Sequence, residues 1–169
     1  MLLLAFDTAT PAISVAVHDG SSVVAEATGE GAMAHGELLA PAIRTALQRA
    51  GAAPSDLTDV AVGVGPGPFT GLRVGVVTAL SLGQTLGLTT HGVCSLDILA
   101  AEAAADFDEE FVVATDARRK EVYWGRFTPE GVRVTGPDVD YPETVAALGM
   151  PVVGRGGTLY ADRFATVHD

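Results

Sequence analysis

The sequence predicts an α/β protein built from two copies of one module, the second copy being incomplete. Two observations lead to this fold class. The order strand, strand, strand, helix, strand, helix can be traced twice along the 169 residues, which indicates duplication of one unit. Each copy also opens with three short apolar runs separated by turn residues, the pattern of an antiparallel meander. An acidic run at 106–110 changes the local composition, so we expect the modules at 1–105 and 106–169.

The first module is predicted from the spacing of its apolar residues. Asp19-Gly20 marks a tight hairpin between two strands, and Gly51 ends a helix whose apolar residues recur at helical spacing. A continuous apolar run indicates a buried strand that a Gly/Pro loop connects to a longer helix. In order, we expect strands at 1–6, 13–17 and 23–27, a helix at 38–50, a strand at 60–64, a helix at about 70–86, a strand at 89–93 and a helix at 96–105.

The second module repeats this order over fewer residues. Pro129-Glu130-Gly131 marks its hairpin turn. The expected elements are strands at 111–115, 122–127 and 132–135, a helix at 143–148, a strand at 152–153 and a glycine turn at 154–157. Too few residues follow Val153 for a further helix, strand and helix of usual length. We therefore expect the second module to be truncated.

Composition and charge argue against several classes of function. The chain has 10 Lys and Arg against 21 Asp and Glu, a formal net charge of −11. This balance argues against direct, high-affinity binding of nucleic acid, because that affinity comes mostly from Lys and Arg. The single cysteine, Cys94, excludes an internal disulfide and a multi-cysteine metal site. The apolar start lacks a basic flank and is interrupted by Asp7, so we expect a soluble, cytoplasmic protein without membrane contact.

The most distinctive segment is Gly65-Pro66-Gly67-Pro68-Phe69-Thr70-Gly71-Leu72-Arg73-Val74-Gly75. It is not a P-loop, because no Gly-Lys-Ser/Thr follows. It is not a dinucleotide fingerprint either, because its glycines are differently spaced and Pro66 and Pro68 lack amide donors. Glycines let the backbone approach a neighbour closely, and the N-terminus of the following helix can attract an anion. From these residues alone, a structural turn and an anion site both stay open.

Four segments in the same order resemble the TsaB (YeaZ) family, the partner subunits in bacterial threonylcarbamoyladenosine tRNA modification. The loop is similar to the family signature GPGSFTGLRxG, with Pro68 in place of the usual serine. The other three segments are Leu4-Ala5-Phe6-Asp7-Thr8-Ala9-Thr10, His35-Gly36-Glu37-Leu38-Leu39-Ala40-Pro41 and Asp116-Ala117-Arg118-Arg119-Lys120-Glu121-Val122-Tyr123-Trp124. The signature-loop residues are Gly65, Pro66, Gly67, Phe69, Thr70, Gly71 and Arg73.

The resemblance implies the fold shared by actin, Hsp70 and sugar kinases. This actin-like ATPase (ribonuclease H-like) fold has two modules, each with a mixed sheet led by a three-strand meander. Its first hairpin commonly carries an Asp-x-Gly-Ser/Thr motif that approaches nucleotide phosphates. The equivalent here makes Asp7, Thr8 and Thr10 candidate nucleotide-binding residues, with Ala9 in place of the glycine. The alternative is an Asx-type turn closed by these side chains.

The helix after the loop carries small residues at every fourth position, namely Gly71, Gly75, Ala79, Gly83 and Gly87. Such a stripe lets another helix approach closely, but packing onto the chain's own sheet explains it equally well. In TsaB-like proteins this helix and the helix at 38–50 form the interface to the transferase subunit TsaD. The resemblance therefore implies a partner interface made by Leu39, Ile43, Leu72, Val76 and Ala79.

No catalytic or metal site is visible in the sequence. The relative TsaD binds a metal through an HxxxH-type motif, whereas the corresponding segment here contains His91 without a second histidine. A Gly-x-Ser-x-Gly nucleophile elbow is missing, and Cys94 has no base partner at motif level. We therefore expect no catalytic residue and no metal ligand. The expected role is that of a non-catalytic subunit that stabilises and positions TsaD.

The expected partners and cofactors follow from the same resemblance. The partners are TsaD in a heterodimer, the ATPase TsaE in the complex, tRNA only through the complex, and a second copy of the chain when it is alone. We expect no cofactor on the isolated chain and allow ATP and magnesium in the complex. Two alternatives stay open: a stand-alone ATP-dependent phosphotransferase of the sugar-kinase type, and a glycoprotease-like metalloenzyme.

Two charged runs allow two interpretations each. Arg118-Arg119-Lys120 is the only run of three basic residues. We expect solvated charge on an exposed hairpin turn, and the alternative is a contact to the phosphates of tRNA or of a nucleotide. The acidic run at 106–110 is interpreted as a solvated linker, with a contact to a basic partner as the alternative.

Overall fold

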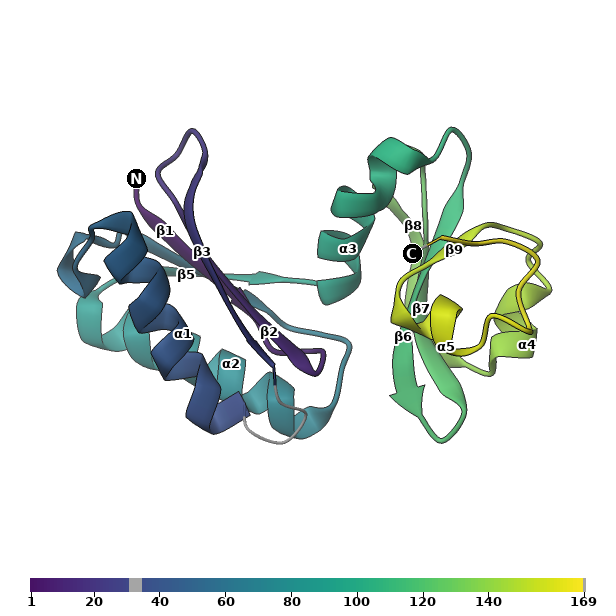
Figure 1. Ribbon diagram of the computed structural model, residues 1–169, viewed down its shortest axis with the longest axis horizontal. Coiled ribbons are helices and arrows are strands. Elements are labelled where there is room, and N and C mark those ends of the chain that lie inside the picture. Colours follow the sequence, from purple (N-terminus) through teal and green to yellow (C-terminus); the bar gives the residue numbers. More distant parts are fainter. Residues whose placement is uncertain (31–34, 169) are drawn as a thin grey trace. The chain divides into compact units, whose positions relative to one another are not determined.

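The computed structural model describes residues 1–30 and 35–168 and consists of two compact units, Met1–Val93 and Cys94–Asp169. Each unit is a five-stranded mixed sheet accompanied by helices (Figure 1). The predicted fold class, two α/β modules of which the second is smaller, is confirmed.

The first unit is built around strand β1. β1 (Leu3–Asp7) pairs antiparallel with β2 (Ala12–His18) and parallel with β4. The sheet order is β3-β2-β1-β4-β5. Its other elements are β3 (Val23–Glu30), α1 (His35–Ala50), the 3₁₀ turn η1 (Pro54–Asp56), β4 (Asp59–Gly63), α2 (Phe69–Leu86) and β5 (Thr89–Val93). The expected strands and helices of this unit are thus present, with small shifts at their ends.

The core of the first unit lies between the sheet and helices α1 and α2. Leu4 and Phe6 of β1 are buried, whereas their chain neighbours are only half-buried, as expected for alternation along a strand. From the helices, Leu39, Ala46 and Ala79 enter the same cluster. α1 packs on β2 and β3, and α2 packs on β4 and contacts α1 (Figure 1). One face of each helix is therefore used by the unit's own sheet.

The second unit has its sheet between two apolar clusters. The sheet order is β10-β9-β6-β7-β8. Central strand β6 is buried over its first five residues, which is typical of a strand covered on both faces. Its elements are α3 (Ser95–Ala103), the 3₁₀ turn η2 (Ala104–Asp106), β6 (Phe111–Arg118), β7 (Glu121–Phe127), β8 (Arg133–Asp140), α4 (Pro142–Ala146), β9 (Val152–Val153), α5 (Arg155–Leu159) and β10 (Val167–His168).

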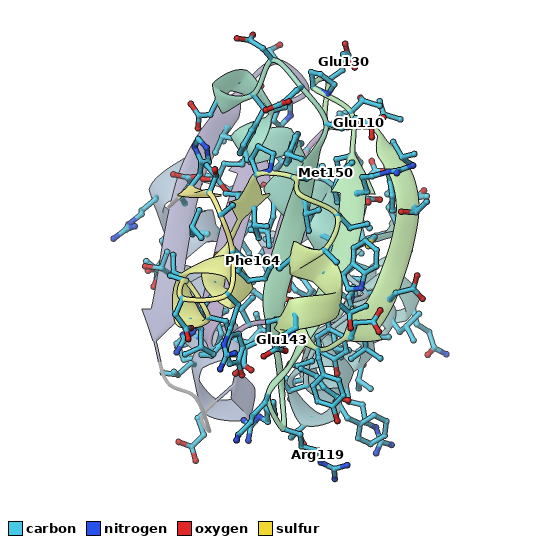
Figure 2. All side chains as sticks on the ribbon, turned by 90° about the vertical axis from the view of Figure 1, so that its right-hand side faces the viewer. Glu110, Arg119, Glu130, Glu143, Met150 and Phe164 are labelled. Carbon is cyan, nitrogen blue, oxygen red and sulfur yellow. The ribbon has the colours of Figure 1, made fainter. Side chains whose placement is uncertain are left out.

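Alternate residues of β6 enter different clusters. Phe111 and Val113 pack with α3, while Val112 and Ala114 pack with residues of α4, β9 and the segment that contains Phe164. Figure 2 shows Phe164 beside the short C-terminal elements. The second module therefore completes its core with five-residue helices and two-residue strands.

The compact units divide after Val93, earlier than the boundary that the acidic run suggested at residue 105. The reason is that α3 places Leu96, Ala100 and Ala103 in the core of the second unit. The acidic run itself is not a solvated linker, because Phe107 is buried and its ring stacks on Phe111 with centroids 4.2 Å apart. Its carboxylates flank a turn that leads into β6.

Within the described part of the chain, no helix combines the length and apolar character that crossing a bilayer requires.

Candidate functional site

The signature loop is held against the loop that follows β1. Gly63 ends β4 beside Asp7, and a Cβ atom at position 63 would overlap the Asp7 carboxylate. Gly67 lies so close to the backbone of Ala9 that a Cβ there would overlap the Ala9 carbonyl and Cα. At position 67 two backbone segments meet without room for a side chain, whereas at position 63 the close neighbour is the side chain of Asp7. The sequence gives no separate signal for Gly63, which lies inside the apolar run 60–64.

Thr8 connects the two loops through a buried hydrogen bond. Its side chain is fully buried, and its Oγ1 donates to the carbonyl oxygen of Gly71 at 2.8 Å. Gly75, one turn further along α2, faces the same hydroxyl. A buried hydroxyl that keeps a partner avoids the cost of an unsatisfied polar group. The N-terminal end of α2 is thus fastened to the first hairpin of the sheet.

The small-residue stripe of α2 faces the unit's own sheet from Gly71 to Gly83, while the exposed Gly87 caps the helix. Gly71, Gly75 and Ala79 are buried, and Gly83 packs against Thr90 of β5. Of the two interpretations offered for the stripe, packing onto the chain's own sheet is the one observed. The docking interpretation of the stripe is therefore corrected.

The five expected partner-interface residues divide into two groups. Leu39 and Ala79 are 1% and 0% exposed and belong to the core. This corrects their expected role as direct contacts, because their side chains point into the first unit. Ile43, Leu72 and Val76 are half-buried and keep some exposed surface. Their interface role stays a prediction.

The exposed side of α2 carries three apolar residues besides the expected interface residues. Phe69, Val77 and Leu80 are 72%, 57% and 57% exposed. At 100° per residue they lie on the side that also holds Leu72 and Val76. The helical spacing of these residues predicts this face from the sequence, beside the stripe of small residues.

Arg73 lies on this same side, with its guanidinium carbon 4.9 Å from the centroid of the Phe69 ring. A cation over an aromatic face is attracted by the ring. The α2 outer face is hereafter defined by Phe69, Leu72, Arg73, Val76, Val77 and Leu80. It is a mostly apolar surface, and two of its residues, Phe69 and Arg73, belong to the signature loop.

The candidate nucleotide-binding residues make turn hydrogen bonds. The Asp7 carboxylate accepts a hydrogen bond from the backbone N–H of Ala9, and the Thr10 hydroxyl donates to the Ala12 carbonyl at 3.0 Å. Thr8 is buried as described, so it presents no surface to a nucleotide. These contacts match the Asx-type turn that the sequence offered as the alternative. A nucleotide role for Asp7 and Thr10 stays a prediction.

His91 pairs with an aspartate of the neighbouring strand. Its Nε2 lies 2.9 Å from Oδ1 of Asp59. Hydrogen bonds from His91 and then from the Thr58 hydroxyl lower the pKa of the Asp59 carboxyl below its usual value. Residues 1–30 and 35–168 contain no group of three His, Cys, Asp or Glu side chains placed to hold a metal ion.

Sequence comparison connects this geometry to known proteins. The family model described as "TsaD: tRNA N6-adenosine threonylcarbamoyltransferase" matches residues 25–165. An uncharacterised protein of Mycobacterium tuberculosis is 43% identical over 158 residues, covering 88% of this chain and 72% of its own. The Bacillus subtilis tRNA threonylcarbamoyladenosine biosynthesis protein TsaB is 35% identical over 127 residues. That alignment covers 75% of this chain and 55% of the Bacillus protein.

Comparison with solved structures agrees with the sequence comparison. YeaZ from Pseudomonas aeruginosa superposes with a TM-score of 0.83 at 32% identity, covering 99% of this chain and 83% of that one. The activator of 2-hydroxyisocaproyl-CoA dehydratase from Clostridium difficile has a TM-score of 0.51 at 14% identity, so it shares the fold alone. The two modules therefore have the actin-like fold expected from the resemblance. By family model, relatives and structure together, the chain belongs to the TsaB (YeaZ) family.

Proposed function

We propose that this chain is a non-catalytic subunit of the complex that forms threonylcarbamoyladenosine next to the anticodon of tRNAs, and that it stabilises and positions the transferase subunit TsaD. The names of its TsaB relatives support the pathway. The observation that carries the subunit role is the α2 outer face, where Phe69, Val77 and Leu80 expose apolar side chains on one side of a helix. An exposed apolar surface of this kind is typical of a protein interface.

The contacts of the first hairpin favour a structural over a catalytic use. The Thr8 hydroxyl, at the candidate phosphate site, is engaged with Gly71. The signature loop is seated on the backbone of Ala9, where a phosphate cradle would need open backbone. The arrangement fastens α2 in one orientation and thereby fixes the direction in which its outer face points.

The proposed assembly contains a heterodimer with TsaD, to which the ATPase TsaE is added, and it binds tRNA only as a complex. The same outer face would hold a second copy of the chain when TsaD is missing, since an apolar surface tends to find a substitute partner. The proposed location is the cytoplasm. The chain itself takes no cofactor in this proposal, while ATP and magnesium belong to the complex.

Co-purification with tagged TsaD from the same organism tests the interface. Leu80→Asp places a charge in the centre of the proposed contact and should reduce recovery of the complex by at least about tenfold, because an unpaired charge at an interface centre is costly. The side chain of Leu80 is 57% exposed, so the isolated variant should keep its melting temperature.

Val23→Asp is the matched control. Val23 is 52% exposed and belongs to β3 of the same unit, so the same substitution there should leave co-purification intact. Normal recovery of TsaD by both Leu80→Asp and Val77→Asp would refute the proposed interface. Loss of binding by Val23→Asp as well would show that the effect is not specific to α2.

A further inference from the structure

The turn between β6 and β7 has an unusual backbone. Arg118, Arg119 and Lys120 have φ angles of 63°, 52° and 67°. This left-handed region is uncommon for residues other than glycine, asparagine and aspartate. Two-residue hairpin turns with positive φ at both positions strongly prefer Asn-Gly, yet here three long cationic side chains occupy the turn. Strained backbone of this kind is found preferentially at functional sites.

The turn is also a concentration of unpaired positive charge. Three of the 10 cationic residues of the chain lie in it, and all three are exposed. In the described part of the chain, none of the three forms an ion pair, whereas Arg126, Arg133 and Arg163 each pair with a carboxylate.

The turn lies at one end of the second unit's sheet, where Asp116 and Glu121 flank it. Figure 2 shows Arg119 at one end, at the tip of the hairpin and directed away from the sheet, while Glu110 and Glu130 lie at the other end. The three adjacent cations therefore project beyond the carboxylates of Asp116, Glu121 and Asp140, which lie on the strands behind the turn.

The turn holds its shape without help from the cations. The backbone N–H of Arg118 donates to Oδ1 of Asp116 at 2.8 Å, and β6 and β7 pair on either side of the turn. The three residues themselves are exposed. Because the backbone of the turn is already ordered, a ligand that binds the three cations does not have to order the main chain.

We propose that the β6–β7 turn binds the phosphate backbone of tRNA within the complex, a partner contact that rests on the proposed function. Guanidinium groups match phosphate oxygens in geometry and charge, and contacts to the backbone position an RNA without reading its sequence. The net charge of −11 keeps the isolated chain from binding RNA. The contact forms only when another subunit holds the tRNA and raises its local concentration at the turn.

The double substitution Arg119→Asn with Lys120→Gly separates charge from structure. Asn-Gly is the sequence that this turn conformation prefers, so the variant keeps the hairpin while it removes two charges. The measurement is binding of an in vitro transcribed tRNA to the purified complex with TsaD, by fluorescence anisotropy at several salt concentrations. Affinity should fall by about tenfold near physiological salt, and the slope of log K against log salt should decrease by about two, one for each lost phosphate contact.

Two further variants serve as controls. Arg155→Gln with Arg163→Gln removes the same amount of charge from exposed positions of the same unit. If the position of the charges determines the affinity for tRNA, and not the net charge, this variant should change that affinity by less than about twofold. Arg119→Lys with Lys120→Arg keeps both charges and should bind tRNA as the original complex does.

The outcomes are decisive in each direction. Unchanged tRNA affinity and salt slope in the Asn-Gly variant overturn the proposed contact, while the complex with TsaD and its activity stand. An equal loss of tRNA affinity in the variant at 119 and 120 and in the control variant at 155 and 163 also overturns the proposal, because the effect is then one of net charge. A change in ATP affinity with unchanged tRNA affinity assigns the turn to nucleotide phosphates and likewise contradicts the proposal. Absence of modification by the wild-type complex would count against the proposed function instead.

Discussion

At the scale of single residues, the signature loop is explained by close approach between two backbone segments. Gly67 contacts the backbone of Ala9, and Gly63 lies against Asp7. The neighbour of Gly67 is main chain and the neighbour of Gly63 is a side-chain carboxylate. A Cβ atom at either position would overlap that neighbour. The glycines of the loop therefore serve first to seat α2 on the sheet.

Gly67→Ala should be strongly destabilising for that reason. The new Cβ meets the carbonyl oxygen and Cα of Ala9, and backbone cannot be displaced by a rotamer change. We expect a loss of about 2 kcal/mol in the free energy of unfolding, the usual range for an overpacked site. Urea unfolding measures it. Gly36→Ala is the control, because nothing lies within 4 Å of a Cβ at position 36, and a cost equal to that of Gly67→Ala would contradict the account.

The Asp59–His91 pair predicts that the stability of the fold depends slightly on pH in the acidic range. The folded-state pKa of Asp59 lies below its ordinary value of 3.8, chiefly through the hydrogen bond with His91. The ionised carboxylate therefore stabilises the fold above that value, and the stabilisation is lost as the pH falls through the folded-state pKa. The melting temperature of Asp59→Asn should differ most from that of the original chain near neutral pH. The difference should shrink below about pH 4; a difference independent of pH would disprove this.

At the scale of elements, α2 shows what sequence could and could not predict. Its position and length follow from apolar spacing and from the loop before it. The direction of its stripe does not, because Gly71, Gly75 and Ala79 mark a side without bulk whether that side meets a partner or the protein's own sheet. Tertiary contacts such as that between Gly75 and Thr8 decide the direction, and those two residues are far apart in sequence. In the same way, the pattern of α3 predicts a helix but not that Leu96 packs in the second core.

The β6–β7 hairpin gives a prediction about stability that is separate from RNA binding. Three residues with positive φ store conformational strain that Asn-Gly relieves at two positions. Arg119→Asn with Lys120→Gly should therefore raise the free energy of unfolding by about 1 kcal/mol. Chemical denaturation of the isolated chain measures this. A loss of stability would mean that the cationic side chains support the turn, contrary to their exposure.

At the scale of the whole molecule, the charge of −11 determines when the cationic turn can act. Long-range repulsion opposes the approach of RNA to the isolated chain, and three local cations release few counterions. The isolated chain should therefore show no tRNA binding up to on the order of 10 μM protein at physiological salt, measured by anisotropy with the same transcript. Binding in that range by the chain alone would contradict the requirement for the complex.

The central claim is that the chain assists a transferase through the α2 outer face and performs no chemistry itself. The most direct measurement is reconstituted threonylcarbamoylation of tRNA with TsaD and TsaE, run with the original chain, with Leu80→Asp and with the chain left out. The account predicts full modification in the first reaction and background in the other two. Undiminished modification without the chain, or modification by the chain without TsaD, would contradict it.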